Sequence, residues 1–323
     1  MSLLDRKYFR DEKAAFAHLE SILWADGVVC PHCGAVDKAG RLNGVKDKAG
    51  RPRPGLWKCY SKECRKQFTA KVGTVFESAH IPLHKMLQAV HLMCSSKKGI
   101  SAHQLHRTLE VDYKSAWFLA HRIREAMRDG TLTPMGGSGK IVEVDETYLG
   151  SQDGHARATG KGSGRGSAAG HKNIVLTLVE RGGPARSFHV GSFGVDTVLP
   201  IVRQNIRRES RFMTDQAQQY RRMGKEFAQH GRVEHSANEY VRGDVHTNTV
   251  EGYYSIFKRG MKGVYQHCSE KHLHRYLSEF DFRYSNRVGL GVNDEARTGR
   301  ALQGMVGKRL TYRAADRSKA AKA

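Results

Sequence analysis

The stretch "KIVEVDETYLG", Lys140–Gly150, has the apolar pattern of a half-buried β-strand, and the prediction of the fold starts from it. Side chains alternate between the two faces of a strand. Val142 and Val144 therefore face a core, whereas Glu143 and Asp145 share the opposite face. Asp145 comes near the predicted end of the strand, which makes it the first candidate for a functional acid.

The segments that follow alternate between strand and helix patterns. "NIVLTLVERGG" and "ARSFHVGSF" predict a hairpin with "RGGPA" as its turn. "DTVLPIVRQNI" predicts a helix with Asp196 as N-cap, and "RFMTDQ" a short strand that ends at Asp215. "GRVEHSA" predicts another strand, followed by a helix in "HTNTVEGYYSIFKRG", His246–Gly260. The Gly- and Ser-rich segment 150–173 is expected to be a loop. This order predicts a mixed α/β sheet of the RNase H type.

Three acids are expected to meet at one edge of this sheet. Asp145 and Asp215 lie at predicted strand ends, and Glu251 lies on the helix after the fifth strand. Carboxylates gathered in one cleft need cations, and oxygen-only ligation suits Mg²⁺ or Mn²⁺. Two such ions about 3.5–4 Å apart can activate a water or a 3′-hydroxyl and stabilise the leaving oxygen at phosphorus. The acids therefore predict a two-metal site for phosphoryl transfer.

Each of these acids has an alternative. Glu146 could be the ligand in place of its neighbour Asp145. Asp215 could be an ordinary cap at a strand end. Asn248, one helical turn before Glu251, could be a helix cap or could assist the metal site.

Basic residues follow Glu251 on the same predicted helix and just after it. Lys258 lies seven residues further on, almost two turns or about 10 Å of rise, so both side chains leave the same face. A lysine there would meet a DNA phosphate beside the cleft. Arg259 and Lys262, in "KRGMKG", are also predicted to contact the DNA backbone. The aromatic residues of this helix are expected mainly to pack it against the sheet.

Cysteine pairs in the N-terminal region predict a structural zinc site. "CPHCG" has the spacing C-x2-C, and "WKCYSKECRKQF" has the wider spacing C-x4-C. Two such pairs complete a tetrahedral thiolate site, which indicates a zinc ribbon over about residues 28–70. His32 could compete for one ligand position, and unrelated thiols are the alternative. The four predicted zinc ligands are Cys30, Cys33, Cys59 and Cys64.

The middle of the chain, 83–128, has helical periodicity. Ser101 and Asp112 are predicted N-caps of two short helices that resemble a helix-turn-helix. A plain helical linker is the alternative. The basic side chains of the second helix expected to contact DNA are Lys114, His121, Arg122 and Arg124. The predicted domains are an N-terminal region 1–78, a helical DNA-binding segment 79–137, a catalytic domain 138–298 and a basic tail 299–323.

The charge balance favours a nucleic-acid partner. The 323 residues include 54 Lys and Arg against 32 Asp and Glu, a net charge of +22. Lys and Arg neutralise phosphates and supply most non-specific affinity for DNA. No apolar run approaches the roughly 20 residues of a membrane span, and the N-terminus lacks the apolar core of a signal peptide. We therefore expect a cytoplasmic, nucleoid-associated protein with no membrane partner.

The motifs "VEVDETYLG" and "MTDQ", with the block His246–Arg287, resemble the bacterial insertion-sequence transposases with a DDE catalytic domain. The resemblance is specifically to the insertion-sequence family fifteen-ninety-five group, whose members carry a leading zinc ribbon. It covers the chain from Cys30 to about Arg287 and implies an RNase H-like core. It also implies cleavage and strand transfer at transposon ends, with the terminal inverted repeats and target DNA as partners, and at least a dimer in the synaptic complex.

Carried over by position, the resemblance places the catalytic triad on Asp145, Asp215 and Glu251, with the following basic residue at Lys258. It implies two Mg²⁺ or Mn²⁺ ions at the triad and one structural Zn²⁺ in the ribbon. Some members use Asn as the third residue, which keeps Asn248 open. The competing hypotheses are a zinc-ribbon and helix-turn-helix regulator without catalysis, and an RNase H-like nuclease without strand transfer.

Overall fold

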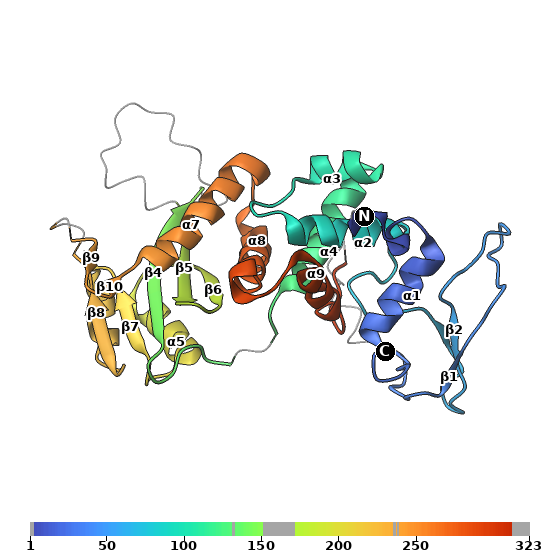
Figure 1. Ribbon diagram of the computed structural model, residues 1–323, viewed down its shortest axis with the longest axis horizontal. Coiled ribbons are helices and arrows are strands. Elements are labelled where there is room, and N and C mark those ends of the chain that lie inside the picture. The colour runs from blue at the N-terminus through green and yellow to red at the C-terminus, as the bar shows by residue number, and fades with distance from the viewer. Residues whose placement is uncertain (1–2, 131–132, 151–171, 235–236, 238, 312–323) are drawn as a thin grey trace, which may run out of the picture. The chain divides into compact units, whose positions relative to one another are not determined.

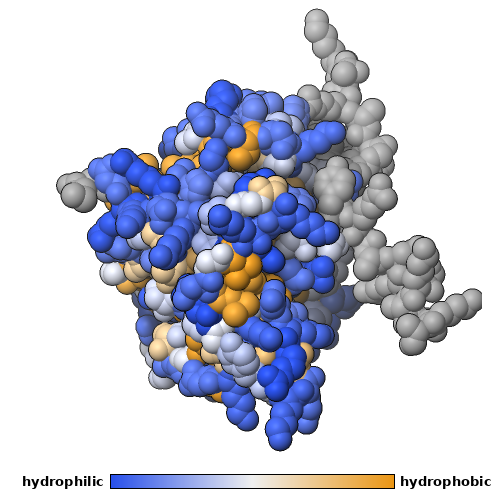
Figure 2. Space-filling model, turned by 90° about the vertical axis from the view of Figure 1, so that its right-hand side faces the viewer, coloured by the Kyte–Doolittle hydropathy of each residue, from blue (hydrophilic) through white to orange (hydrophobic). Residues whose placement is uncertain are grey.

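The computed structural model describes residues 3–130, 133–150, 172–234, 237 and 239–311, and the chain divides into two compact units (Figure 1). The N-terminal unit combines Met1–Ser96, Ile100–Met127 and Asp294–Ala323, and the sheet unit combines Lys97–Gly99 and Arg128–Asn293. Figure 2 shows a face of the molecule on which hydrophilic side chains dominate and hydrophobic ones form small patches. Among the described residues, no helix has the length and apolar character needed to span a membrane.

The N-terminal unit begins with short 3-10 turns, η1 (Leu3–Asp5) and η2 (Lys7–Phe9), and helix α1 (Glu12–Leu23). A small antiparallel sheet follows, in the order β1-β2-β3. Glu20 of α1 is buried and accepts a hydrogen bond from Trp57 Nε1 at 2.9 Å, and it also pairs with Arg41. One buried carboxylate therefore ties α1 to two strands of the sheet. The strands are β1 (Ala39–Arg41), β2 (Trp57–Cys59) and β3 (Gln67–Phe68).

The predicted helices of the middle segment are present as α2 (Leu83–Ser95), α3 (Ala102–Leu109) and α4 (Tyr113–Met127). Both predicted N-caps are confirmed. Ser101 Oγ accepts from Gln104 N at 3.1 Å, and Asp112 Oδ1 accepts from Ser115 N at 3.0 Å.

The C-terminal part of the chain departs from the predicted division at 298. Helix α9 (Asp294–Gln303) belongs to the N-terminal unit and packs on α2. Arg297 of α9 donates to Cys94 O at 2.9 Å, and Ala301 and Leu302 are buried. The tail predicted from residue 299 therefore begins with the second half of a packed helix.

The sheet unit is built on a mixed five-stranded sheet with the order β6-β5-β4-β7-β8. Strands β4, β5 and β6 pair antiparallel, whereas β7 and β8 run parallel to β4. This is the predicted α/β mixed sheet, with the predicted hairpin between β5 and β6. The strands are β4 (Ile141–Leu149), β5 (Asn173–Glu180), β6 (Ala185–Val190), β7 (Arg211–Thr214) and β8 (Gln229–Arg232). The predicted loop lies largely in 151–171, outside the described residues.

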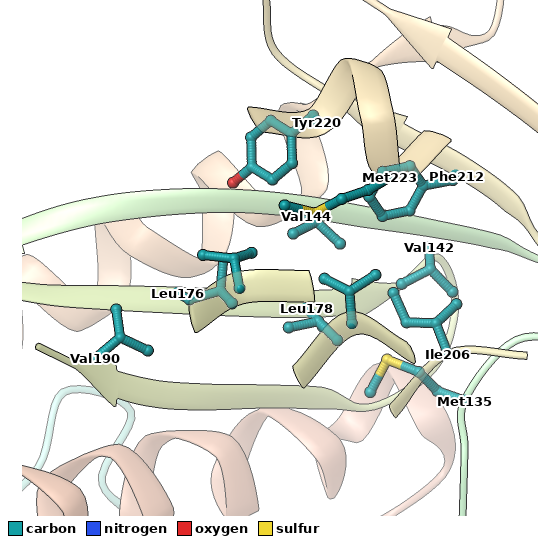
Figure 3. Packing of buried hydrophobic residues seen from close by; sticks show 12 residues of the cluster. Met135, Val142, Val144, Leu176, Leu178, Val190, Ile206, Phe212, Tyr220 and Met223 are labelled. Atoms are coloured by element: carbon teal, nitrogen blue, oxygen red, sulfur yellow. The ribbon is translucent and has the colours of Figure 1, made fainter. Parts of the chain in front are cut away.

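Helices cover both faces of this sheet. On one face, α5 (Val195–Asn205) and α6 (Gln218–Gly224) enclose a core to which β4, β5 and β7 contribute (Figure 3). Helix α5 has Gly194 at its N-cap and not the predicted Asp196, which lies inside the first turn. The other face is covered by α7 (Asn248–Gly260), a π-helical turn η4 (Met261–Tyr265) and α8 (Glu270–Ser285), which share a second core with β5 and β6.

A short hairpin that the sequence pattern did not predict precedes α7. Its strands are β9 (Val241–Arg242) and β10 (Val245–His246). After α8, a short 3-10 turn, η5 (Val288–Leu290), leads toward α9.

Candidate active site and zinc centre

The sheet register brings Asp145 and Asp215 together. Val144 of β4 is the parallel partner of Thr214, the last residue of β7, and each acid is the next residue along the chain. Carboxylate oxygens of Asp145, Asp215 and Glu146 lie within 4.8 Å of one another. We call these three residues the acid cluster.

The position of Asp145 differs from its prediction near a strand end. Strand β4 continues to Leu149, because its antiparallel pairing with β5 extends to Leu149 and Asn173. Only the pairing with β7 stops at Val144. Asp145 is therefore paired with Thr177 of β5 on one side. On the other side, the pairing with β7 stops one residue before it.

Neighbouring side chains fix each member of the acid cluster. Asp215 Oδ1 accepts from Ala217 N at 2.9 Å, which turns the chain from β7 toward α6. Glu146 Oε2 accepts from the hydroxyl of Tyr220, a fully buried residue of α6, at 2.9 Å. Tyr254 of α7 donates its hydroxyl to the main-chain oxygen of Asp145 at 2.6 Å. Elements from both faces of the sheet thus position the acids.

The electrostatics of the acid cluster favour a bound cation. Burial, and then the charges of Glu146 and Asp215, raise the pKa of Asp145 to about 8. Burial, and then the charge of Asp215, raise the pKa of Glu146 to about 7. Crowded carboxylates that resist ionisation form an all-oxygen donor set of the kind that hard divalent cations prefer. The donor chemistry therefore fits Mg²⁺ or Mn²⁺.

Glu251 lies at the edge of this site and not inside the acid cluster. It is exposed in the first turn of α7, and its carboxylate is not among the oxygens grouped within 4.8 Å. Its charge still contributes to the raised pKa of Asp145, after burial and the nearer acids. Thr247, which is buried, donates its hydroxyl to Glu251 Oε1 at 2.9 Å and so orients the carboxylate.

The other predicted site residues lie on the solvent side of α7 or just beyond it. Asn248, its first residue, is exposed, as is Arg259, which donates to Ser255 Oγ. Lys258 is half-buried, with Nζ 5.8 Å from the centre of the Tyr254 ring. Lys262 follows in η4 and is exposed. A polar, mostly basic stripe therefore runs along the helix from Glu251.

The aromatic residues of α7 pack into the core, as predicted. Tyr253, Tyr254 and Phe257 are all buried between the sheet and α8. The hydroxyl of Tyr253 donates to Asp281 Oδ1 of α8 at 2.6 Å. Their burial leaves them no exposed ring face on which a base could stack.

The four predicted zinc ligands converge. Cys30 Sγ lies 3.8 Å from Cys64 Sγ, and Cys33 Sγ lies 3.8 Å from Cys59 Sγ. All four sulfurs lie within 4.8 Å of one another. A tetrahedron with zinc–sulfur bonds of about 2.3 Å has edges of about 3.8 Å, so the donor set fits Zn²⁺. His32 is not part of this group of ligand atoms; its ring packs edge-on against Phe68.

The predicted DNA contacts on α4 need correction. His121, Arg122 and Arg124 are buried, and only Lys114 of the predicted set is exposed. Arg122 donates to Glu77 O at 3.0 Å, and its guanidinium lies 4.7 Å from the Phe118 ring centre. Arg122 therefore serves the packing of the N-terminal unit.

Glu143 is a buried acid whose contacts the sequence pattern did not reveal. Its side chain is fully buried and accepts from Thr249 N at 2.8 Å and from Val250 N at 3.0 Å. The pattern did place it on the face of Asp145, which is the face that α7 covers. The sequence signal for such contacts was an acid, Glu143, in the middle of a strand rich in apolar residues.

Comparison with known proteins agrees with this geometry. Residues 136–285 match the family described as the ISXO2-like transposase domain, a DDE domain, and residues 10–67 match the transposase zinc-ribbon domain. The chain is also 28% identical over 290 residues to an uncharacterised protein in transposable element ISH50 of Halobacterium salinarum, over 86% of this chain and 92% of that protein. Residues 10–67 and 136–285 therefore carry the zinc-ribbon and ISXO2-like DDE domains of insertion-sequence transposases.

Proposed function

We propose that this protein binds the terminal DNA of its insertion sequence and catalyses metal-dependent phosphodiester cleavage and strand transfer into target DNA. The observation that carries the proposal is the meeting of Asp145 in β4 with Asp215, which directly follows β7, in a chain with a net charge of +22. The strand order, with three antiparallel strands followed by two parallel ones, supports an RNase H-like assignment.

Asp145 and Asp215 would hold divalent cations, with Glu146 as a further ligand from the acid cluster and Glu251 completing the site from α7. Bound there, two cations would activate the attacking hydroxyl and stabilise the leaving oxygen of an in-line displacement at phosphorus. Asn248, at the start of α7, is the alternative third residue.

The rest of α7 and the turn η4 that follows it would hold the DNA in line with the acids. Lys258 would bind a backbone phosphate, and Arg259 and Lys262 would extend that contact along the strand. Tyr254 would connect the two, because its hydroxyl donates to the main-chain oxygen of Asp145 and Lys258 Nζ lies 5.8 Å from its ring centre. The helix thus couples DNA binding to the position of the reacting phosphate.

The proposal extends to partners and location. The substrates are the terminal inverted repeats and the target DNA, and pairing two ends requires at least a dimer in the synaptic complex. A DNA substrate of this kind places the protein in the cytoplasm, associated with the nucleoid. The ribbon would hold one structural Zn²⁺ through Cys30, Cys33, Cys59 and Cys64.

The test is cleavage of duplex DNA that carries the element's ends, in Mg²⁺ or Mn²⁺. Asp215→Asn should lose cleavage by more than the roughly 10- to 100-fold typical of changes outside the ligand shell, because it removes a ligand. It should still bind the DNA. Glu209→Gln, at an exposed position before β7, is the matched control and should keep wild-type activity.

Two results would redirect the assignment. Undiminished cleavage by Asp215→Asn, or no metal-dependent cleavage by the wild type, would favour the hypothesis of a DNA-binding regulator without catalysis. Cleavage without joining, in an assay with pre-cleaved ends and target DNA, would leave a nuclease.

A further inference from the structure

We propose that Glu143 is a positioning residue that sets the distance between the acid cluster and Glu251 by capping the N-terminus of α7; this rests on the proposed function. Glu143 lies two residues before Asp145 on the same face of β4. Its carboxylate is bound to the first turn of the helix that carries Glu251. One buried side chain therefore connects the two elements that must supply ligands to one site.

The contacts of Glu143 with α7 are those of a helix cap supplied by another element. Oε2 accepts from Thr249 N at 2.8 Å and from Val250 N at 3.0 Å, and Oε1 accepts from Thr249 Oγ1 at 2.8 Å. Free N–H groups and the positive end of the helix dipole favour a carboxylate at this place. Thr247, the N-cap residue, makes no capping hydrogen bond with its side chain, because its hydroxyl serves Glu251.

Arg181 also binds the carboxylate of Glu143. Its Nε donates to Glu143 Oε1 at 2.5 Å, while Nη2 donates to His246 O at 2.9 Å and Nη1 to Asp244 O at 2.8 Å. The same guanidinium therefore fixes both the cap and the chain that enters α7 from β10. His246 Nδ1 lies 3.3 Å from Glu143 Oε1. This network leaves the start of α7 little freedom to shift along the sheet.

The geometry connects this anchor to Glu251. Glu251 follows the capped residues Thr249 and Val250 directly, and its main-chain N–H donates to Thr247 O at 3.1 Å. A displaced first turn would carry Glu251 with it. Outer-shell partners that orient ligands typically change metal affinity or activity by about 10- to 100-fold when they are removed.

A purely structural role for Glu143 is the competing explanation, and the chain offers a matched control for it. Asp281 of α8 is a half-buried acid, and its carboxylate accepts from Tyr253 Oη at 2.6 Å and from Ser187 N at 2.7 Å. It secures α7 farther along the helix, away from the first turn. Asp281→Asn should therefore loosen the packing of α7 against α8 without changing the Mn²⁺ concentration needed for half-maximal cleavage.

The experiment compares Glu143→Gln with Asp281→Asn in the full chain. We expect Glu143→Gln to raise the Mn²⁺ concentration for half-maximal cleavage by about 10- to 100-fold and to weaken Mn²⁺ binding measured calorimetrically without DNA. Amide exchange in the peptide spanning the first turn of α7 should become faster, and affinity for the DNA ends should stay unchanged. Thr249→Val, which removes one donor and keeps the main-chain bonds, should shift the Mn²⁺ requirement in the same direction by less.

Four outcomes separate the hypotheses. An unchanged Mn²⁺ affinity in Glu143→Gln, or an equal loss in Asp281→Asn, would overturn the positioning role. If Glu143→Gln does not fold, a wild-type Mn²⁺ requirement in Thr249→Val would overturn it. Full cleavage by Asp215→Asn would instead refute the proposed function itself, whatever Glu143 does.

Discussion

At the scale of single residues, the acid cluster places like charges where they destabilise the fold. Asp145 and Glu146 have pKa values raised to about 8 and about 7, by burial first and then by neighbouring carboxylates. Functional sites often carry such unfavourable arrangements, which a ligand relieves. In this site a divalent cation would supply the missing positive charge.

This arrangement gives a prediction for stability in the presence of a chelator. The folded chain binds more protons at Asp145 and Glu146 than the unfolded chain does, because their folded pKa values are raised from 3.8 and 4.5. Their contribution to stability is therefore complete below about pH 4 and is lost as the pH rises toward 8. We expect the wild-type melting temperature in EDTA to fall between pH 6 and pH 8.

Asp145→Asn should flatten this dependence and melt higher than the wild type at pH 8 in EDTA, by about 2–4 °C for each kcal/mol of repulsion relieved. The order should reverse on adding Mn²⁺, which stabilises the chain that binds it. Thermal melts at several pH values, in EDTA and in Mn²⁺, measure both the pH dependence and the reversal of the order. Glu209→Gln is the control and should melt like the wild type. A lower melting temperature of Asp145→Asn in EDTA would contradict the argument.

At the scale of elements, periodicity predicted most helices and strands, but not how their ends pair. The alternation in "KIVEVDETYLG" placed Asp145 on the correct face, yet the strand continues to Leu149 because β5 extends beside it. The cysteine spacing predicted which four thiols converge, since the tight turn within each pair brings its two sulfurs together. The packing of α4 was missed because a basic residue on a helix has the same sequence pattern whether its stem is buried or exposed.

The zinc ribbon allows a prediction at this scale. Its core holds Cys30, Cys59 and Phe68, packed against Trp24 and Trp57. Such a small core depends on its metal. Cys59→Ser should therefore lower the zinc content below one ion per chain and shift tryptophan emission to longer wavelength. The control is Cys268→Ser, which lies outside the thiolate group and should retain zinc and the wild-type spectrum. Retention of one full equivalent of zinc by Cys59→Ser would show that the thiolates do not form the site.

At the scale of the whole molecule, the chain combines an excess of positive charge with a local concentration of acids. The net charge of +22 attracts DNA to the protein as a whole. The acid cluster, in contrast, repels a DNA phosphate unless bound cations neutralise its carboxylates. Binding and catalysis should therefore respond differently to ions. Composition indicated the partner, but the coupling of the acid cluster to α7 through Glu143 depends on long-range contacts that no local pattern specifies.

The salt dependence of DNA binding tests this separation. Each phosphate neutralised by a lysine contributes about −0.9 to the slope of log affinity against log salt on duplex DNA. Lys258→Ala and Lys262→Ala should each reduce the slope by about 1, measured by fluorescence anisotropy in EDTA so that cleavage cannot occur. The matched control is Lys225→Ala. Lys225 is exposed and directly follows α6, which covers the face of the sheet opposite α7, so this substitution should leave the slope unchanged. An equal reduction of the slope for all three substitutions would mean that DNA binding depends on the overall positive charge. The helix that carries Glu251 would then not guide the DNA to the acids.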